Sequence, residues 1–152
     1  MDRSGPSDLL IRQRLRALAK NLQAAARGNA DALHQARVES RRVREALPLV
    51  SSGGRARRLE RQVRRITQAL GPVRELDVAL QILDDMERSG AASRPAVSRL
   101  RQVVARERHL LQIDMRRQLE GCDLEKLRKR ALRPAGKSKA PAPKRDPARR
   151  QR

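Results

Sequence analysis

The absence of aromatic side chains limits most strongly what this chain can fold into. Phe, Trp and Tyr are all missing from its 152 residues. A hydrophobic core must therefore be built from Leu, Ile, Val, Ala and Met, and about 130 residues suffice for one such core. Apolar residues recur at three- and four-residue spacing, beginning with Ile11, Leu15, Leu18 and Leu22. This spacing is typical of one face of a helix, so we predict an all-α fold.

The positions of the glycines and prolines predict where helices begin and end. Pro48 and the Gly71-Pro72 pair are expected to end helices, because proline lacks the amide hydrogen that continues a helix. We expect an antiparallel bundle of about four to six helices over residues 7–132. The expected helices cover residues 7–27, 30–47, 55–70, 72–88 and 93–119, with a short sixth helix over 123–132.

The chain is strongly basic and becomes more so near its end. Its formal net charge is +20, which calls for an anionic partner such as nucleic acid, an anionic membrane or polyphosphate. Residues 133–152 hold four prolines, eight basic residues and one acid, and we predict a disordered basic tail there. Arginine dominates the rest, and its planar fork suits phosphate. Without aromatic rings, single-stranded nucleic acid cannot be bound by the usual base stacking.

Several other kinds of protein are disfavoured. Cys122 is the only cysteine, so no internal disulfide can form. The first residues are interrupted by charges, unlike a signal peptide, and no apolar run approaches the roughly 18 residues of a membrane span. A cytoplasmic protein is therefore expected. Asp84, Asp85 and Glu87 have no histidine nearby in sequence, so we expect a solvated acidic turn and no metal or cofactor.

One helix carries a stripe of basic side chains. His34, Arg37, Arg41 and Arg44 fall on one helical face beside the apolar face, over a length of about 15 Å, whereas Arg42 points elsewhere. Residues 32–74 hold eleven arginines and three glutamates, and residues 75–87 hold five acids and no base. Such segregation costs stability, which favours a binding role. A solvated face with no role for His34 is the plainer alternative.

Two blocks of the sequence resemble the CHAD family, the conserved-histidine α-helical domains. "HQARVESRRVREAL" is similar to a signature of His, two residues, Arg, three residues, Arg-Arg, one residue and Arg, which is matched by His34, Arg37, Arg41, Arg42 and Arg44. "ALGPVRELDVAL" resembles a second block at Leu70, Gly71, Arg74, Glu75, Asp77 and Val78, with Glu75 where the family usually has Asp. The resemblance covers roughly residues 9–132.

The resemblance implies a function. CHAD domains are helical bundles that bind inorganic polyphosphate along a basic groove, often beside polyphosphate granules or polyphosphate enzymes. It implies that Arg74 joins the stripe in lining this groove and that Asp77 holds an arginine in place. Arg42 belongs to the matched signature, and Arg58 and Arg65 are weaker candidates.

The resemblance also bears on assembly. The usual CHAD domain is about twice as long, with two halves related by pseudo-twofold symmetry, and only the first half is matched here. A homodimer is therefore expected. The helix over 93–119 would contribute through Val103, Val104, Leu110, Leu111 and Ile113.

Other functions compete with polyphosphate binding. The main rival is nonspecific nucleic-acid binding through the arginine-rich helices and the tail; a ribosome- or granule-associated structural protein would use the same surface. Phosphotransfer histidine domains typically continue with x-x-Lys-Gly, whereas His34 is followed by Gln-Ala-Arg. His109 has no arginine three residues later, and we expect ordinary surface packing there. We therefore predict a binding protein that breaks no bond.

Overall fold

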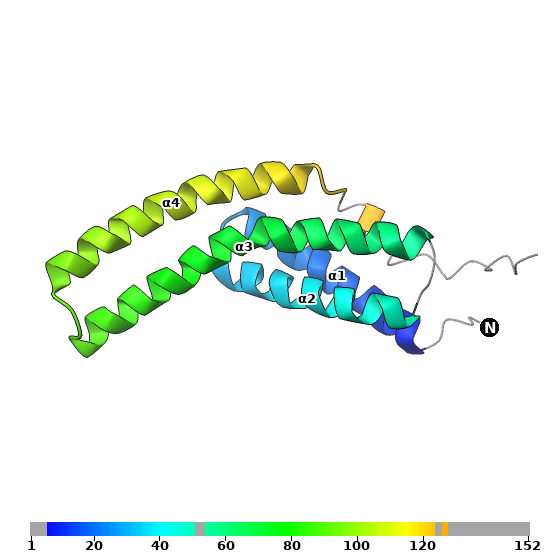
Figure 1. The fold of residues 1–152 in the computed structure, drawn as a ribbon, viewed down its shortest axis with the longest axis horizontal. Coiled ribbons are helices and arrows are strands. Elements are labelled where there is room, and N and C mark those ends of the chain that lie inside the picture. Colours follow the sequence, from blue (N-terminus) through cyan, green and yellow to red (C-terminus); the bar gives the residue numbers. More distant parts are fainter. Residues whose placement is uncertain (1–5, 51–53, 124–125, 128–152) are drawn as a thin grey trace, which may run out of the picture.

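The computed structural model describes residues 6–50, 54–123 and 126–127. Within these ranges the chain forms four helices, and the all-α prediction is confirmed (Figure 1). The predicted tail over 133–152 and most of the predicted sixth helix over 123–132 lie outside the described residues. The helices are α1 (Pro6–Ala26), α2 (Ala30–Val50), α3 (Gly54–Ser89) and α4 (Arg94–Glu120).

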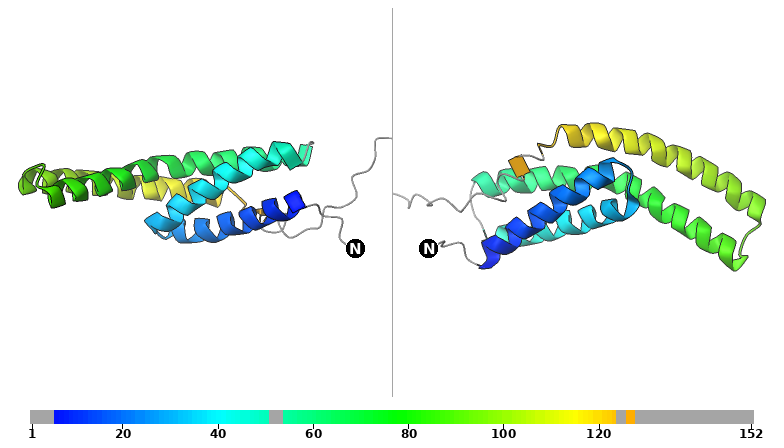
Figure 2. Two further views of the ribbon diagram at one scale, coloured as in Figure 1. Left: turned by 90° about the horizontal axis from the view of Figure 1, so that it is seen from below. Right: turned by 180° about the vertical axis from the view of Figure 1, so that it is seen from behind.

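The molecule consists of a helical body and a two-helix arm. α1, α2 and the first half of α3 form the body, and the second half of α3 continues beyond it beside the first half of α4 (Figures 1 and 2). The end of α4 returns to the body, where Met115 and Leu119 join its core. That core is aliphatic, as predicted, and its fully buried members include Leu18, Leu22, Leu33, Ala36, Val43, Val63, Ile66 and Leu70.

The turn between α1 and α2 fixes the position of α4. Gly28 adopts a φ of 96°, which glycine tolerates without steric cost. Asn29 then caps α2, because its Oδ1 accepts a hydrogen bond of 2.7 Å from the backbone N–H of Ala32. On the other side of the turn, Gln112 of α4 donates to the carbonyl of Ala25 at 2.9 Å. The end of α1 and the middle of α4 are thereby held together.

Two predicted helix boundaries are wrong. Residues 55–70 and 72–88 belong to one 36-residue helix, α3, which contains Pro72 and changes direction near its middle (Figure 1). A proline inside a helix removes one hydrogen bond and bends the axis. The helix continues because Leu70 and Val73, which flank the Gly-Pro pair, are fully buried in packed surroundings. Pro48 likewise lies inside α2, which ends two residues later at Val50.

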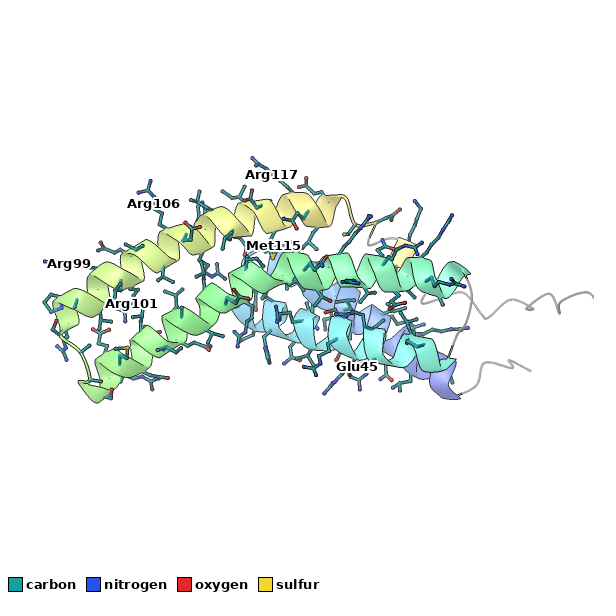
Figure 3. All side chains as sticks on the ribbon, viewed as in Figure 1. Glu45, Arg99, Arg101, Arg106, Met115 and Arg117 are labelled. Carbon is teal, nitrogen blue, oxygen red and sulfur yellow. The ribbon has the colours of Figure 1, made fainter. Side chains whose placement is uncertain are left out.

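Ion pairs link the two helices of the arm. Arg101 points from α4 towards α3, whereas Arg99 and Arg106 point away from it (Figure 3). The guanidinium of Arg101 lies 2.8 Å from Asp84 and 2.6 Å from Glu87. Asp84 and Asp85 are exposed, as expected of a solvated acidic turn. Asp84 and the half-buried Glu87 also pair with Arg101 and so link α3 to α4.

Asp77 and Arg108 form the most buried of the described ion pairs. Arg108 Nε donates to Asp77 Oδ1 at 2.5 Å, and the Asp77 side chain is 4% exposed. Arg108 also reaches the carbonyl of Gly28 at 3.4 Å. The pair therefore fixes the base of the arm to the α1–α2 turn.

Removing Arg108 should destabilise the fold. Arg108→Met leaves the Asp77 carboxylate buried without its partner, and we expect the free energy of unfolding to fall by about 3 kcal/mol. Arg106→Met, on the exposed side of the same helix, should change it by less than about 0.5 kcal/mol. Urea unfolding followed by circular dichroism measures both. The double variant Asp77→Leu with Arg108→Met should recover much of the loss; equal midpoints for both single variants would contradict this role.

Candidate anion-binding site

A basic hollow of ≈ 600 Å³ lies between α2 and α3. Four of its lining residues belong to the predicted stripe on α2, and Arg74 comes from the middle of α3. Two helices therefore supply basic side chains to one concave surface. The lining residues are His34, Arg37, Val38, Arg41, Arg44, Glu45, Glu60, Thr67 and Arg74.

Small residues hold α2 and α3 close together beneath the hollow. Ala36 and Ser40 of α2 are fully buried. Thr67 of α3 donates a hydrogen bond of 3.0 Å to the Ser40 hydroxyl, which in turn donates to the Arg37 carbonyl at 2.9 Å. Burying a hydroxyl is costly unless it is hydrogen-bonded, so this polar pair fixes the register of the two helices.

Gly71 makes room for Arg37. A Cβ atom at position 71 would lie 3.2 Å from Arg37 Nη1, a contact tight enough that the guanidinium would have to shift by a few tenths of an ångström. Gly71 is buried inside α3, where it neither turns nor ends the helix. Its lack of a side chain lets the guanidinium of Arg37 cross closely over α3. This close approach brings Arg37 of α2 into the same hollow as Arg74 of α3.

Most of the charge in the hollow is not neutralised by the protein. Arg37, Arg44 and Arg74 form no ion pair within the described part of the chain. Arg41 differs, since its Nε donates to Glu45 at 2.8 Å, and this hydrogen bond raises the pKa of Arg41 further above its usual value. Both side chains of that pair are exposed, so an incoming anion could replace Glu45 at little cost.

This arrangement is suited to binding phosphate groups. Each guanidinium offers several donors in a planar fork that matches a phosphate in two places. The exposed His34 lies at the edge of the same surface and adds a further donor. Glu45 and Glu60 also line the hollow, but its four arginines outnumber them. Among the described residues, no group of three His, Cys, Asp or Glu side chains could hold a metal ion.

The structure brings together five of the eight predicted site residues. His34, Arg37, Arg41, Arg44 and Arg74 line the hollow.

The other three predicted residues lie elsewhere. Arg42 lies 3.5 Å from Glu39, which also pairs with Arg14 of α1, because residue 42 faces α1 rather than α3. Arg58 and Arg65 line a separate hollow. Asp77 holds an arginine, as predicted, but this arginine is Arg108 of α4, outside the hollow.

The sequence contained an unused signal for the α3 side of the hollow. Glu60, Thr67 and Arg74 follow one another at seven-residue intervals, and all three line it. Seven residues are close to two helical turns, so this spacing places side chains on one face. The predicted pair of separate helices over 55–70 and 72–88 does not place Arg74 on the same helical face as Glu60 and Thr67, whereas the continuous α3 does.

The fold and this hollow define an all-α protein with an arginine-lined surface hollow. A family model described as the CHAD domain matches residues 9–152, nearly the whole chain. The chain therefore belongs to the CHAD family. No curated protein and no solved structure matches it. None of the described helices is long and apolar enough to span a membrane.

Substituting Gly71 should weaken ligand binding without lowering the stability of the fold. In Gly71→Ala the new methyl group displaces the Arg37 guanidinium. We expect affinity for a phosphate polyanion to fall about threefold to tenfold, because part of one charged contact is lost. Stability should hold or rise, because alanine favours a helix over glycine by about 1 kcal/mol. Calorimetric titration and urea unfolding measure the two effects. Unchanged affinity would show that Arg37 does not need this space.

Proposed function

We propose that this protein binds inorganic polyphosphate in the hollow between α2 and α3 and breaks no bond of its ligand. One observation carries the proposal: basic side chains of two helices converge on one hollow, and three of the arginines have no carboxylate partner within the described ranges. Polyphosphate is a linear chain of linked phosphates with regularly spaced negative charge. Membership of the CHAD family supports this ligand.

Duplex nucleic acid is the rival ligand, and the shape of the site favours polyphosphate over it. A single chain of phosphates can enter a hollow of ≈ 600 Å³ and contact both of its walls. A duplex is much wider and can contact only the rim, where phosphate contacts give nonspecific affinity. The basic residues over 133–152 would add such affinity for any polyanion. We therefore propose polyphosphate as the preferred ligand, and polyphosphate granules as a place where the protein collects.

Charge reversal in the hollow should abolish tight binding. We expect Arg37→Glu with Arg74→Glu to weaken polyphosphate binding by at least about 100-fold, because two charge-assisted contacts are lost. The matched control is Arg99→Glu with Arg106→Glu, which changes the net charge equally on the side of α4 facing away from α3 (Figure 3). At about 0.15 M salt, where screening acts over about 8 Å, the control should lose less than about fivefold.

Competition with DNA completes this test. At matched phosphate concentration and salt, calorimetry should show that the unmodified protein prefers polyphosphate to duplex DNA. The hollow variant should lose this preference, and the control should keep it. Equal losses in the two variants would mean that net charge, not the hollow, determines binding.

We further propose that the protein forms a homodimer through its arm. Residues 75–110 contain six acids and six arginines, so the arm is neutral although the chain carries +20. Two arms can therefore approach without the repulsion that the bodies would meet. Large apolar side chains are also exposed along this arm, more than two helices alone can cover: Val78, Ile82, Leu100, Val103 and Leu110.

Light scattering tests the dimer. We expect the mass of two chains at moderate salt and of one chain for Leu100→Glu with Val103→Glu, because a charged group cannot be buried in an apolar contact without a partner. Ser98→Glu with Gln102→Glu is the control, since it adds the same charge at exposed polar positions of the same helix. A single-chain mass for the unmodified protein, with and without polyphosphate, would contradict the proposal.

A further inference from the structure

A second basic surface lies on the other flank of α3. The exposed side chains of Arg57, Arg58, Arg61, Arg64 and Arg65 crowd into nine residues of one helix. Within the described ranges none of them forms an ion pair. Like charges three or four residues apart on a helix repel, and Arg61 has four such neighbours. An unrelieved cluster of this kind favours an anionic ligand.

Part of this surface is hollowed and firmly built. Arg58, Arg61 and Arg65 line a second hollow of ≈ 300 Å³ with Lys126. Asp123 and Leu127 are held beside them, because Gln62 Nε2 donates to the Asp123 carbonyl at 3.3 Å and Leu127 is buried in the core. Lys126 lies 2.7 Å from Asp123, which supplies the acid in this hollow.

The two hollows lie on opposite flanks of α3. Each residue turns a helix by about 100°, so Arg65 lies about 160° from Thr67, which lines the first hollow. Arg58 and Arg74 are separated by a similar angle. The body core, through Val63 and Ile66, fills the inner side of α3 between the flanks. The outer side therefore offers the only surface route along α3 from one hollow to the other within the described structure.

Arginines cover that outer side. On the same helical wheel, Arg57 and Arg64 follow Arg61, which lines the second hollow, and precede Glu60, which lines the first. All three arginines are exposed. A helix with its side chains is only about 10–12 Å across, so a flexible chain of phosphates can pass over this face and contact guanidinium groups throughout.

We infer that one polyphosphate chain occupies both hollows and crosses the outer face of α3 between them. This inference rests on the proposed function and extends it to chain length: a ligand long enough to span both hollows binds more tightly than one that fills a single hollow. The affinity increases because the two hollows bind parts of the same ligand. Once one hollow is occupied, the rest of the chain is held near the other hollow at a high effective concentration.

Tripolyphosphate and a long polyphosphate distinguish the two hollows. Calorimetric titration of the full chain should give two tripolyphosphate ions per protein chain. Long polyphosphate should bind at least about 100-fold more tightly than tripolyphosphate. Arg58→Glu with Arg65→Glu should leave one tripolyphosphate ion per chain and remove most of the gain for the long ligand. Arg99→Glu with Arg106→Glu is again the control of equal charge and should keep both properties.

A third variant tests the path between the hollows. Arg57 and Arg64 line neither hollow, so Arg57→Glu with Arg64→Glu should keep two tripolyphosphate ions and still weaken long polyphosphate by at least about tenfold. Unchanged long-chain affinity in this variant would overturn the crossing. One tripolyphosphate ion on the unmodified protein, lost in Arg37→Glu with Arg74→Glu, would overturn the second hollow and leave the proposed function standing. No polyphosphate binding by the unmodified protein would overturn both.

Discussion

The close contact between α2 and α3 is the constraint on which the rest of the structure depends. Ser40 and Thr67 join the two helices by a partly buried hydrogen bond, and Gly71 lets Arg37 cross over α3. A side chain at position 71 would displace the Arg37 guanidinium, and larger residues in place of Ser40 or Thr67 would push the helices apart. The contact concentrates positive charge, which is unfavourable on its own. The aliphatic packing of the body, with Leu33, Val43 and Val63 fully buried, supplies the stabilisation that offsets it.

The structure explains the uneven distribution of charge along α3 in two ways. In its second half, Asp77, Asp84 and Glu87 are used internally, because they hold arginines of α4 in the arm. In its first half, the exposed arginines over 57–65 form no ion pair within the described part of the chain. They face the second hollow and the outer surface of α3 beside it. One helix thus separates a neutral arm from a strongly basic body. The body is the part suited to polyanions, and the arm is the part suited to contact with another protein chain.

Periodicity in the sequence predicted the helices well, and proline rules predicted their limits poorly. The helical class, the basic stripe on α2 and the aliphatic core follow from spacing alone, because neighbours three and four residues apart share a face. The continuity of α3 does not, since it depends on burial of Leu70 and Val73 around the Gly-Pro pair. The separation of Arg58 and Arg65 from the stripe is likewise a tertiary fact. Predicting this separation requires knowing which side of α3 faces α2, and no local sequence pattern contains that information.

A crystal structure of the protein with a bound polyphosphate chain would locate the ligand. Phosphates should lie between α2 and α3, with oxygens about 2.7–2.9 Å from guanidinium nitrogens of Arg37, Arg44 and Arg74. Glu45 should then have released Arg41 to the ligand. Phosphates bound only elsewhere, for example along the outer side of α4, with an empty hollow between α2 and α3, would contradict the proposed site.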